Sequence, residues 1–170
     1  MRRYLCLLAG SLLALPCQAQ LGGPTRAGLP RLLDFEADRA IGAPQGWRGG
    51  PNETIFVEHD VVHGGKTGAR LERTASSANA FTSLTLGVPM DFAGKTIEYR
   101  GFVRTQDVSD YVSLWIREDG EGGPLEFETT QNLQVKGTTD WKEYSLRLPV
   151  HADARTLVFG VVLSGTGKAW

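Results

Sequence analysis

The sequence predicts an all-β fold, a jelly-roll-type antiparallel β-sandwich. Short segments with apolar residues at every second position recur along the chain, which is the pattern of strands that bury one face. Turn-forming residues separate these segments at short intervals, as they do in sandwiches and barrels. The sequence shows no helical periodicity of useful length, no internal repeat and no low-complexity tract.

The first residues predict an export signal that lies outside this fold. Two arginines near the start precede a short apolar run over 5–15, and the small residues Cys17 and Ala19 then mark a cleavage site after Ala19. The apolar run is too short to anchor the chain in a bilayer. We therefore expect a signal peptide over 1–19 and an exported protein, periplasmic or extracellular.

Without the predicted signal peptide, the length, the cysteine content and the net charge of the mature chain differ from those of the full sequence. Residues 20–170 are enough for one domain with its own core. Both cysteines lie in the signal, so the mature chain has no disulfide and no thiol chemistry. Sixteen basic residues then face 19 acidic ones, a formal net charge of −3. This balance does not favour nucleic acid or anionic lipid as a partner, and no later segment is apolar enough to span a membrane.

Within the mature chain, residues 20–31 are rich in Gly, Pro and polar residues and predict a flexible leader, followed by the sandwich over 32–170. Nine segments of this domain have the composition of strands. They are LLDFEA (32–37), TIFVEHDV (54–61), ARLERT (69–74), AFTSLTLGV (80–88), TIEYRGFVRT (96–105), YVSLWIRED (111–119), PLEFETT (124–130), KEYSLRLPV (142–150) and TLVFGVVLS (156–164). The last is apolar on both faces, which predicts a central strand. Polar stretches such as QDVSD (106–110) and KGTTD (136–140) predict loops.

Alternation places Trp115 on the polar face of its strand, and this suggests a binding face. The apolar face of the same strand carries Leu114 and Ile116. If neighbouring strands contribute their polar faces, aromatic rings, arginines and glutamates come together. The candidate ligand-binding residues are Trp115, Arg117, Phe102, Tyr111, Arg100, Glu126 and Glu128. Two interpretations are open: cross-strand ion pairs on a solvated sheet, or a platform that stacks and hydrogen-bonds a sugar.

The residues give little support for a catalytic site or a metal site. His59 and His63 have the spacing of a metal pair, but on a strand four residues separate them by about 13 Å, which is too far for one ion. Glu126 and Glu128 could be a carboxylate pair for glycoside hydrolysis, but a separation of about 6.6 Å along one strand is ordinary. The sequence has no GxSxG elbow or P-loop. We expect a protein that is not an enzyme and has no metal site.

Three runs carry a resemblance to a known family: GFVRTQDVSDYVSLWIREDGEGGPLEFETTQN (101–132), KGTTDWKEYSLRLPV (136–150) and LVFGVVLSGTGKAW (157–170). Over 32–170 the chain resembles the galactose-binding or carbohydrate-binding-module type of β-sandwich that precedes the catalytic domain of secreted bacterial S41-type peptidases, relatives of the C-terminal processing (tail-specific) proteases. In that module the segment after GTGKAW continues as a final strand with acidic residues. The resemblance therefore implies a sandwich that lacks its final strand, in a chain without the peptidase domain.

The resemblance also implies partners. Such sandwiches often hold a structural Ca²⁺ through carboxylates and carbonyls, and Asp34 and Glu36 would be its ligands here; no other cofactor is expected. The implied function is a non-catalytic accessory module that binds glycan or packs against a downstream peptidase domain. The alternative is a structural sandwich that serves as a spacer and binds no small molecule.

Overall fold

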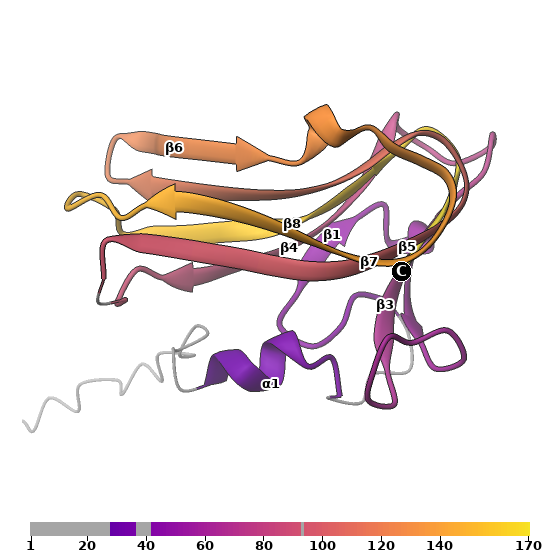
Figure 1. The fold of residues 1–170 in the computed structure, drawn as a ribbon, viewed down its shortest axis with the longest axis horizontal. Helices are drawn as coiled ribbons and strands as arrows, with labels where there is room; N and C mark the ends of the chain where they lie inside the picture. Colours follow the sequence, from indigo (N-terminus) through magenta and orange to yellow (C-terminus); the bar gives the residue numbers. More distant parts are fainter. Residues whose placement is uncertain (1–27, 37–41, 93) are drawn as a thin grey trace, which may run out of the picture.

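The computed structural model describes residues 28–36, 42–92 and 94–170, so the predicted signal peptide lies outside the described residues. Strands dominate the fold, as the sequence predicts (Figure 1). One short α-helix, α1 (Leu29–Leu33), precedes them, and two 3₁₀ turns, η2 (Asn52–Thr54) and η3 (Gln131–Leu133), interrupt them. The strands in the described residues are β1 (Arg48–Gly50), β2 (Ile55–Glu58), β3 (Gly68–Arg73), β4 (Phe81–Pro89), β5 (Thr96–Gly120), β6 (Gly123–Thr129), β7 (Val135–Pro149), β8 (Thr156–Ser164) and β9 (Gly167–Ala169).

All the strand pairs are antiparallel, and the long strand β5 belongs to two layers. Its second half joins layer one, in the order β1-β4-β8-β5-β6, and its first half joins layer two, in the order β7-β5-β9-β3-β2. Figure 1 shows β5 running towards the right of the view, curving there and returning just below β6. This arrangement confirms the predicted antiparallel, jelly-roll-type sandwich.

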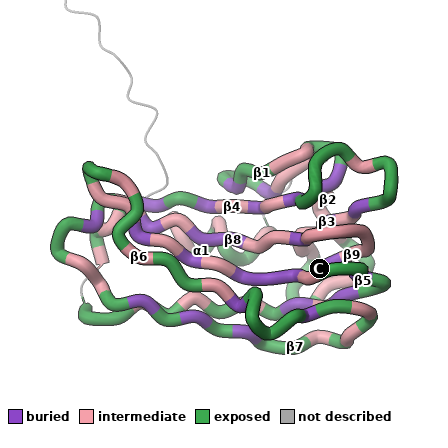
Figure 2. Tube along the Cα trace, turned by 90° about the horizontal axis from the view of Figure 1, so that it is seen from above, coloured by how far each residue is buried: buried purple, intermediate pink, exposed green. Residues whose placement is uncertain are grey.

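The core lies between the two layers. Ile116 and Phe159 from layer one and Leu148 from layer two are buried in it, and the Tyr99 and Phe159 rings join the layers with their centroids 4.9 Å apart. Burial alternates along the strands, as expected where one face of each is covered (Figure 2). The two-residue period thus correctly identifies Leu114 and Ile116 as core-facing residues of β5.

One end of the core is closed by α1 and Trp47. The Trp47 indole donates a hydrogen bond of 2.6 Å to the Leu32 carbonyl, and its ring lies 5.3 Å from that of Phe35 and 5.8 Å from that of Phe159. The predicted strand over 32–37 is therefore wrong. Pro30 in the first turn favours the start of a helix, and the apolar side chains of this segment cover the sandwich instead of joining a sheet.

Two of the predicted loops are also wrong, because QDVSD lies inside β5 and KGTTD inside β7. Register shifts between these strands occur at three places, from Val103 to Val112. Such irregularities bend a strand and increase its twist, which lets β5 pass from one layer to the other. Polar residues at this bend look like a loop in the sequence, although the backbone stays paired.

The apolar segment 156–164 is β8, and it lies between β4 and β5 as the predicted central strand. Gly160 sits where the backbone of β4 comes close: a Cβ added there would lie 2.2 Å from the Leu84 carbonyl oxygen. The short strands β1 and β9 have too few residues for alternation to reveal them. Within the described residues, no helix has the length and hydropathy to cross a membrane.

Candidate functional site

The second half of β5 presents a row of side chains on the outer side of layer one, and Trp115 lies at its centre. Thr129 of β6 and Gly160 of β8 flank Trp115 in the sheet. The Trp115 and Phe127 rings lie 6.3 Å apart, inclined by 32°, and Phe127 is 52% exposed. We call this surface, formed by Trp115, Arg117, Asp119 and Phe127, the Trp115 face.

Charged groups lie next to the ring pair. The Arg117 Nη2 donates a hydrogen bond of 2.8 Å to the Asp119 Oδ2, and Nε lies 2.7 Å from Oδ1. The Arg117 Nε and the Asp119 Oδ1 are both buried, and neither has a hydrogen-bond partner among the described residues. The Trp115 face therefore combines a partly buried indole and an exposed phenyl ring with an ion-paired guanidinium, which keeps N–H donors beyond those that face Asp119.

The structure does not bring all seven predicted site residues together. Tyr111 lies on β5 on the same face as Trp115 and Arg117, towards the bend. Arg100 and Phe102 lie on the first half of β5, in the other layer. The Arg100 Nη2 is 2.8 Å from Glu98 and its Nη1 3.8 Å from Glu143, so this arginine pairs within layer two. The seven residues therefore do not form one platform, and three of them, Tyr111, Trp115 and Arg117, share one surface.

Glu126 and Glu128 lie on the opposite face of β6 from Phe127. They pair in register with Glu118 and Ile116, whose side chains point into the sandwich. The Glu126 carboxylate is 3.9 Å from the His151 Nε2. Arg117 therefore pairs with Asp119 on the outer face, and these glutamates do not share a face with it. Sequence reasoning missed Phe127, because the two-residue period separates two faces of a strand without showing which one meets the neighbour's tryptophan.

His151 also holds a buried carboxylate. Glu118 is completely buried, and its Oε2 lies 2.7 Å from the His151 Nδ1 and accepts the His151 backbone N–H at 3.2 Å. The Glu118 Oε1 has no hydrogen-bond partner among the described residues. This contact fixes the turn before β8 to β5, and it involves none of the rings of the Trp115 face.

A second aromatic group lies on layer two. The His63 ring stacks on Phe102 at 3.7 Å, with 12° between the planes, and lies 5.4 Å from Trp141. The Arg104 guanidinium lies 5.7 Å from the centre of the Trp170 ring. His63, Phe102, Trp141 and Trp170 line a cavity of about 520 Å³. Deeper in the cavity, burial raises the pKa of Tyr99 above its ordinary value.

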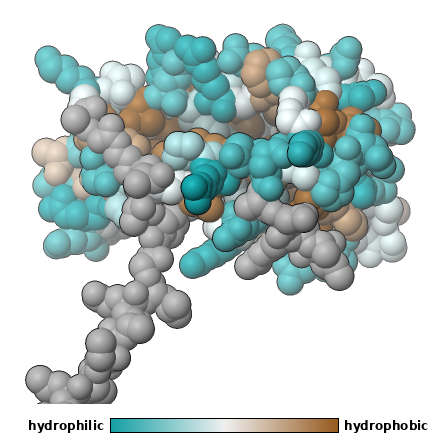
Figure 3. Space-filling view, turned by 90° about the horizontal axis from the view of Figure 1, so that it is seen from below, coloured by the Kyte–Doolittle hydropathy of each residue, from teal (hydrophilic) through white to brown (hydrophobic). Residues whose placement is uncertain are grey.

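The cavity is mostly apolar. Its walls include residues of both layers and of the segment around α1. On the side of the molecule where α1 lies, hydrophobic side chains show between hydrophilic ones (Figure 3). Its volume is within the range of about 300–1,000 Å³ that is typical of small-molecule pockets, so it is a second candidate site.

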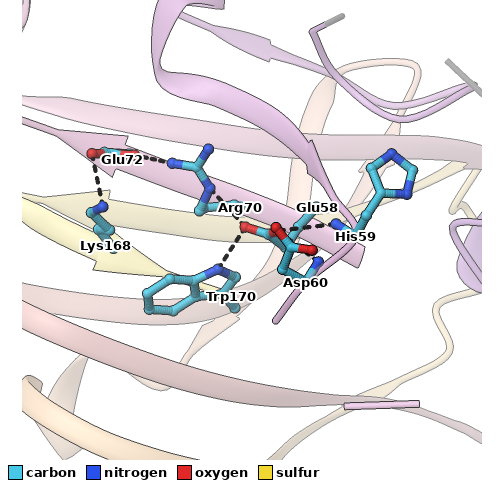
Figure 4. A network of polar contacts seen from close by, with 7 residues as sticks. All are labelled: Glu58, His59, Asp60, Arg70, Glu72, Lys168 and Trp170. Carbon is cyan, nitrogen blue, oxygen red and sulfur yellow. Dashed lines mark hydrogen bonds and ion pairs between the residues drawn. The ribbon is translucent and has the colours of Figure 1, made fainter. Parts of the chain in front are cut away.

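Beside the cavity, a polar network joins β2, β3 and β9 (Figure 4). Glu58 accepts the Trp170 indole N–H at 3.1 Å and lies 2.9 Å from the Arg70 Nε. Burial of Glu58 raises its pKa. Hydrogen bonds from the backbone N–H groups of Asp60 and His59 and from the Trp170 indole, together with the positive charge of Arg70, outweigh burial and lower the pKa to about 2. The carboxylate is therefore a structural link held in its charged form.

Metal ligands are not gathered in the described residues, where no group of three or more His, Cys, Asp or Glu side chains is placed to hold an ion. Asp34 accepts the Glu36 N–H, and Glu36 accepts the N–H groups of Lys66 and Thr67 at 2.7 and 3.2 Å. Both carboxylates of the calcium hypothesis thus serve loop hydrogen bonds, and that hypothesis stays a prediction.

Comparison with known proteins finds a curated relative that matches part of the chain. No family model matches the chain. It is 31% identical over 117 residues to an uncharacterized HTH-type transcriptional regulator, YbfP, of Bacillus subtilis (strain 168), a match that covers 67% of this chain and 40% of that protein. The chain thus spans two fifths of the length of this curated relative.

Two solved structures have the same fold. The enzymatically active domain of tailspike protein 4 of bacteriophage CBA120 superposes with a TM-score of 0.55 at 16% identity, covering 74% of this chain and 18% of that one. TmCBM61, solved in complex with β-1,4-galactotriose, gives 0.51 at 14% identity, covering 75% and 84%. At such identities the likeness shows the fold alone, a sandwich of the carbohydrate-binding-module type.

Proposed function

We propose that this domain is a non-catalytic carbohydrate-binding module and that the Trp115 face is its binding surface. The observation that carries the proposal is the Trp115–Phe127 ring pair, which lies on an open sheet face directly beside the Arg117–Asp119 pair. Its fold neighbour TmCBM61 was solved with a bound galactotriose, and this supports the choice of a sugar as ligand.

The chemistry of the Trp115 face suits a sugar. A sugar ring has apolar C–H patches that pack on aromatic faces and hydroxyls at its edge that both donate and accept hydrogen bonds. The inclined rings of Trp115 and Phe127 would contact the C–H patch. Arg117 would donate and Asp119 would accept hydrogen bonds at the hydroxyls, and bonds to charged groups are among the stronger ones.

The test is titration of the domain with β-1,4-galactotriose and then with a panel of plant and bacterial polysaccharides. We expect Trp115→Ala to weaken binding by tenfold or more, since truncation of a tryptophan that anchors a binding surface costs about 2 kcal/mol or more. Phe102→Ala is the matched control, because Phe102 is 45% exposed but lies on the other layer, and it should bind like the unmodified domain. Equal binding by both variants would contradict the assignment of the face, and binding to no glycan would favour the structural spacer.

We further propose that the domain is exported and forms the leading part of an S41-type peptidase, with a downstream peptidase domain as its partner. The segment over 1–19 supports export, because it has the pattern of a signal peptide. The motif runs over 101–132 and 136–150 support the link to the peptidase. Both proposals rest on the sequence.

A further inference from the structure

The apolar side chains of the Trp115 face continue beyond it across layer one. Phe127 of β6 is paired with Arg117, so it lies diagonally next to Trp115 of β5. On the other side of β5, Val162 of β8 is paired with Ser113, which precedes Trp115 by two residues. Residues two apart on a strand point to the same side of the sheet. Phe127, Trp115 and Val162 therefore form one diagonal line on the outer side of layer one.

Phe81 of β4 is the next member of this line. It is paired with Ser164, which follows Val162 by two residues on β8, so it takes the next diagonal position. Because diagonal neighbours in a sheet lie about 7–8 Å apart, Phe81 is about 15 Å from Trp115. Phe81 and Phe127 are each 52% exposed, so both ends of the line are open. Contiguous apolar side chains on an exposed face mark a binding surface, whereas single ones do not.

Polar groups lie on both sides of this line. Ser83 and Thr85 of β4 lie on one side and Tyr111 of β5 on the other, and all three residues are partly exposed. Among the described residues, none of their hydroxyl groups has a hydrogen-bond partner. Arg48 of β1 is paired with Thr85 and is exposed. The outer side of layer one thus presents an apolar line that is flanked by available hydrogen-bonding groups.

We propose that this line binds the interior of a linear glycan, whose chain runs from Phe127 and Trp115 over Val162 to Phe81. The inference rests on the proposed function and adds the length and the course of the ligand. Each sugar unit presents a C–H patch between hydroxyls, which matches an apolar line with polar groups on both sides. A polypeptide strand would need free backbone groups, but β8 and the second half of β5 are paired on both sides. A disaccharide would cover the Trp115–Phe127 pair and leave Phe81 in water.

The test compares the affinities of a disaccharide and a hexasaccharide by calorimetric titration. The probes are fragments of β-1,4-galactan and of any other polysaccharide of the panel that binds. We expect the unmodified domain to bind the hexasaccharide more tightly than the disaccharide. Phe81→Ala should weaken hexasaccharide binding by about tenfold, as expected for the loss of an aromatic anchor, and change disaccharide binding by less than about twofold. Trp115→Ala should weaken the binding of both, and the control Phe102→Ala should change neither.

A second readout uses the unmodified domain and so does not depend on the folding of a variant. The ring signals of Phe81 should shift when the hexasaccharide is added and stay unchanged with the disaccharide. Hexasaccharide binding that neither shifts the Phe81 ring nor weakens in Phe81→Ala would overturn the inference, while a loss of binding in Trp115→Ala would still support the proposed function. If no polysaccharide of the panel binds, the proposed function fails and the inference fails with it.

Discussion

Replacement of Glu58 by glutamine tests whether one partly buried carboxylate, 13% exposed, governs the stability of this domain in acid. The folded protein lowers the pKa of Glu58 from 4.5 to about 2. A carboxyl group whose pKa is lower in the folded state stabilises the fold at pH values above its unfolded pKa, and this contribution is lost as the pH falls towards the folded pKa. The shift corresponds to about 3 kcal/mol at neutral pH, of which about 2 kcal/mol is lost by pH 3.

The assay is urea unfolding of the unmodified domain and of Glu58→Gln across this range. We expect the difference in unfolding free energy between them to shrink from about 3 kcal/mol at neutral pH to about 1 kcal/mol near pH 3. Glu143→Gln is the control, because the Glu143–Arg100 pair is long, at 3.8 Å, and exposed, and such pairs contribute about 0–1 kcal/mol. A Glu58→Gln variant that loses stability in parallel with the unmodified domain would refute the reasoning.

Two other predictions concern the core and the parent protein. Arg73 is 5% exposed and donates hydrogen bonds to Gly165, Thr82 and Asn79; Arg73→Met should cost about 3 kcal/mol or more in urea unfolding, because it leaves buried acceptors unpaired. A loss below about 1 kcal/mol would contradict this. The native product, detected with an antibody to this domain, should be much heavier than the 18.5 kDa of the chain if a peptidase domain follows; a product of the mature chain's own mass would contradict the peptidase proposal.

The sequence was informative about the fold wherever alternation was regular. Strand β8 matches the predicted segment 156–164, and β4 differs from its prediction by one residue at each end. The alternation did not predict a strand at the bend of β5, because the residues there are polar and resemble a loop although their backbone stays paired. It also failed at Leu32, whose side chain packs against the core from a helix.

The site was predictable only in part, for a physical reason. The two-residue period correctly placed Trp115 and Arg117 together, since both lie on one strand. It could not show that β5 crosses between layers, which separates Phe102 and Arg100 from Trp115. Nor could it show that Phe127 faces outwards beside Trp115. Relations between strands depend on topology and register, which the alternation of a single strand does not contain.

The measurement that tests the central claim most directly is a map of amide and indole chemical-shift changes as a bound glycan, beginning with β-1,4-galactotriose, is added. If the Trp115 face is the binding surface, the largest chemical-shift changes fall on the Trp115 indole, Arg117 and Phe127. The chemical shifts of the Trp141 and Trp170 indoles do not change. Changes centred on Trp141 and Trp170, with Trp115 unmoved, would contradict the account and move the site to the other layer.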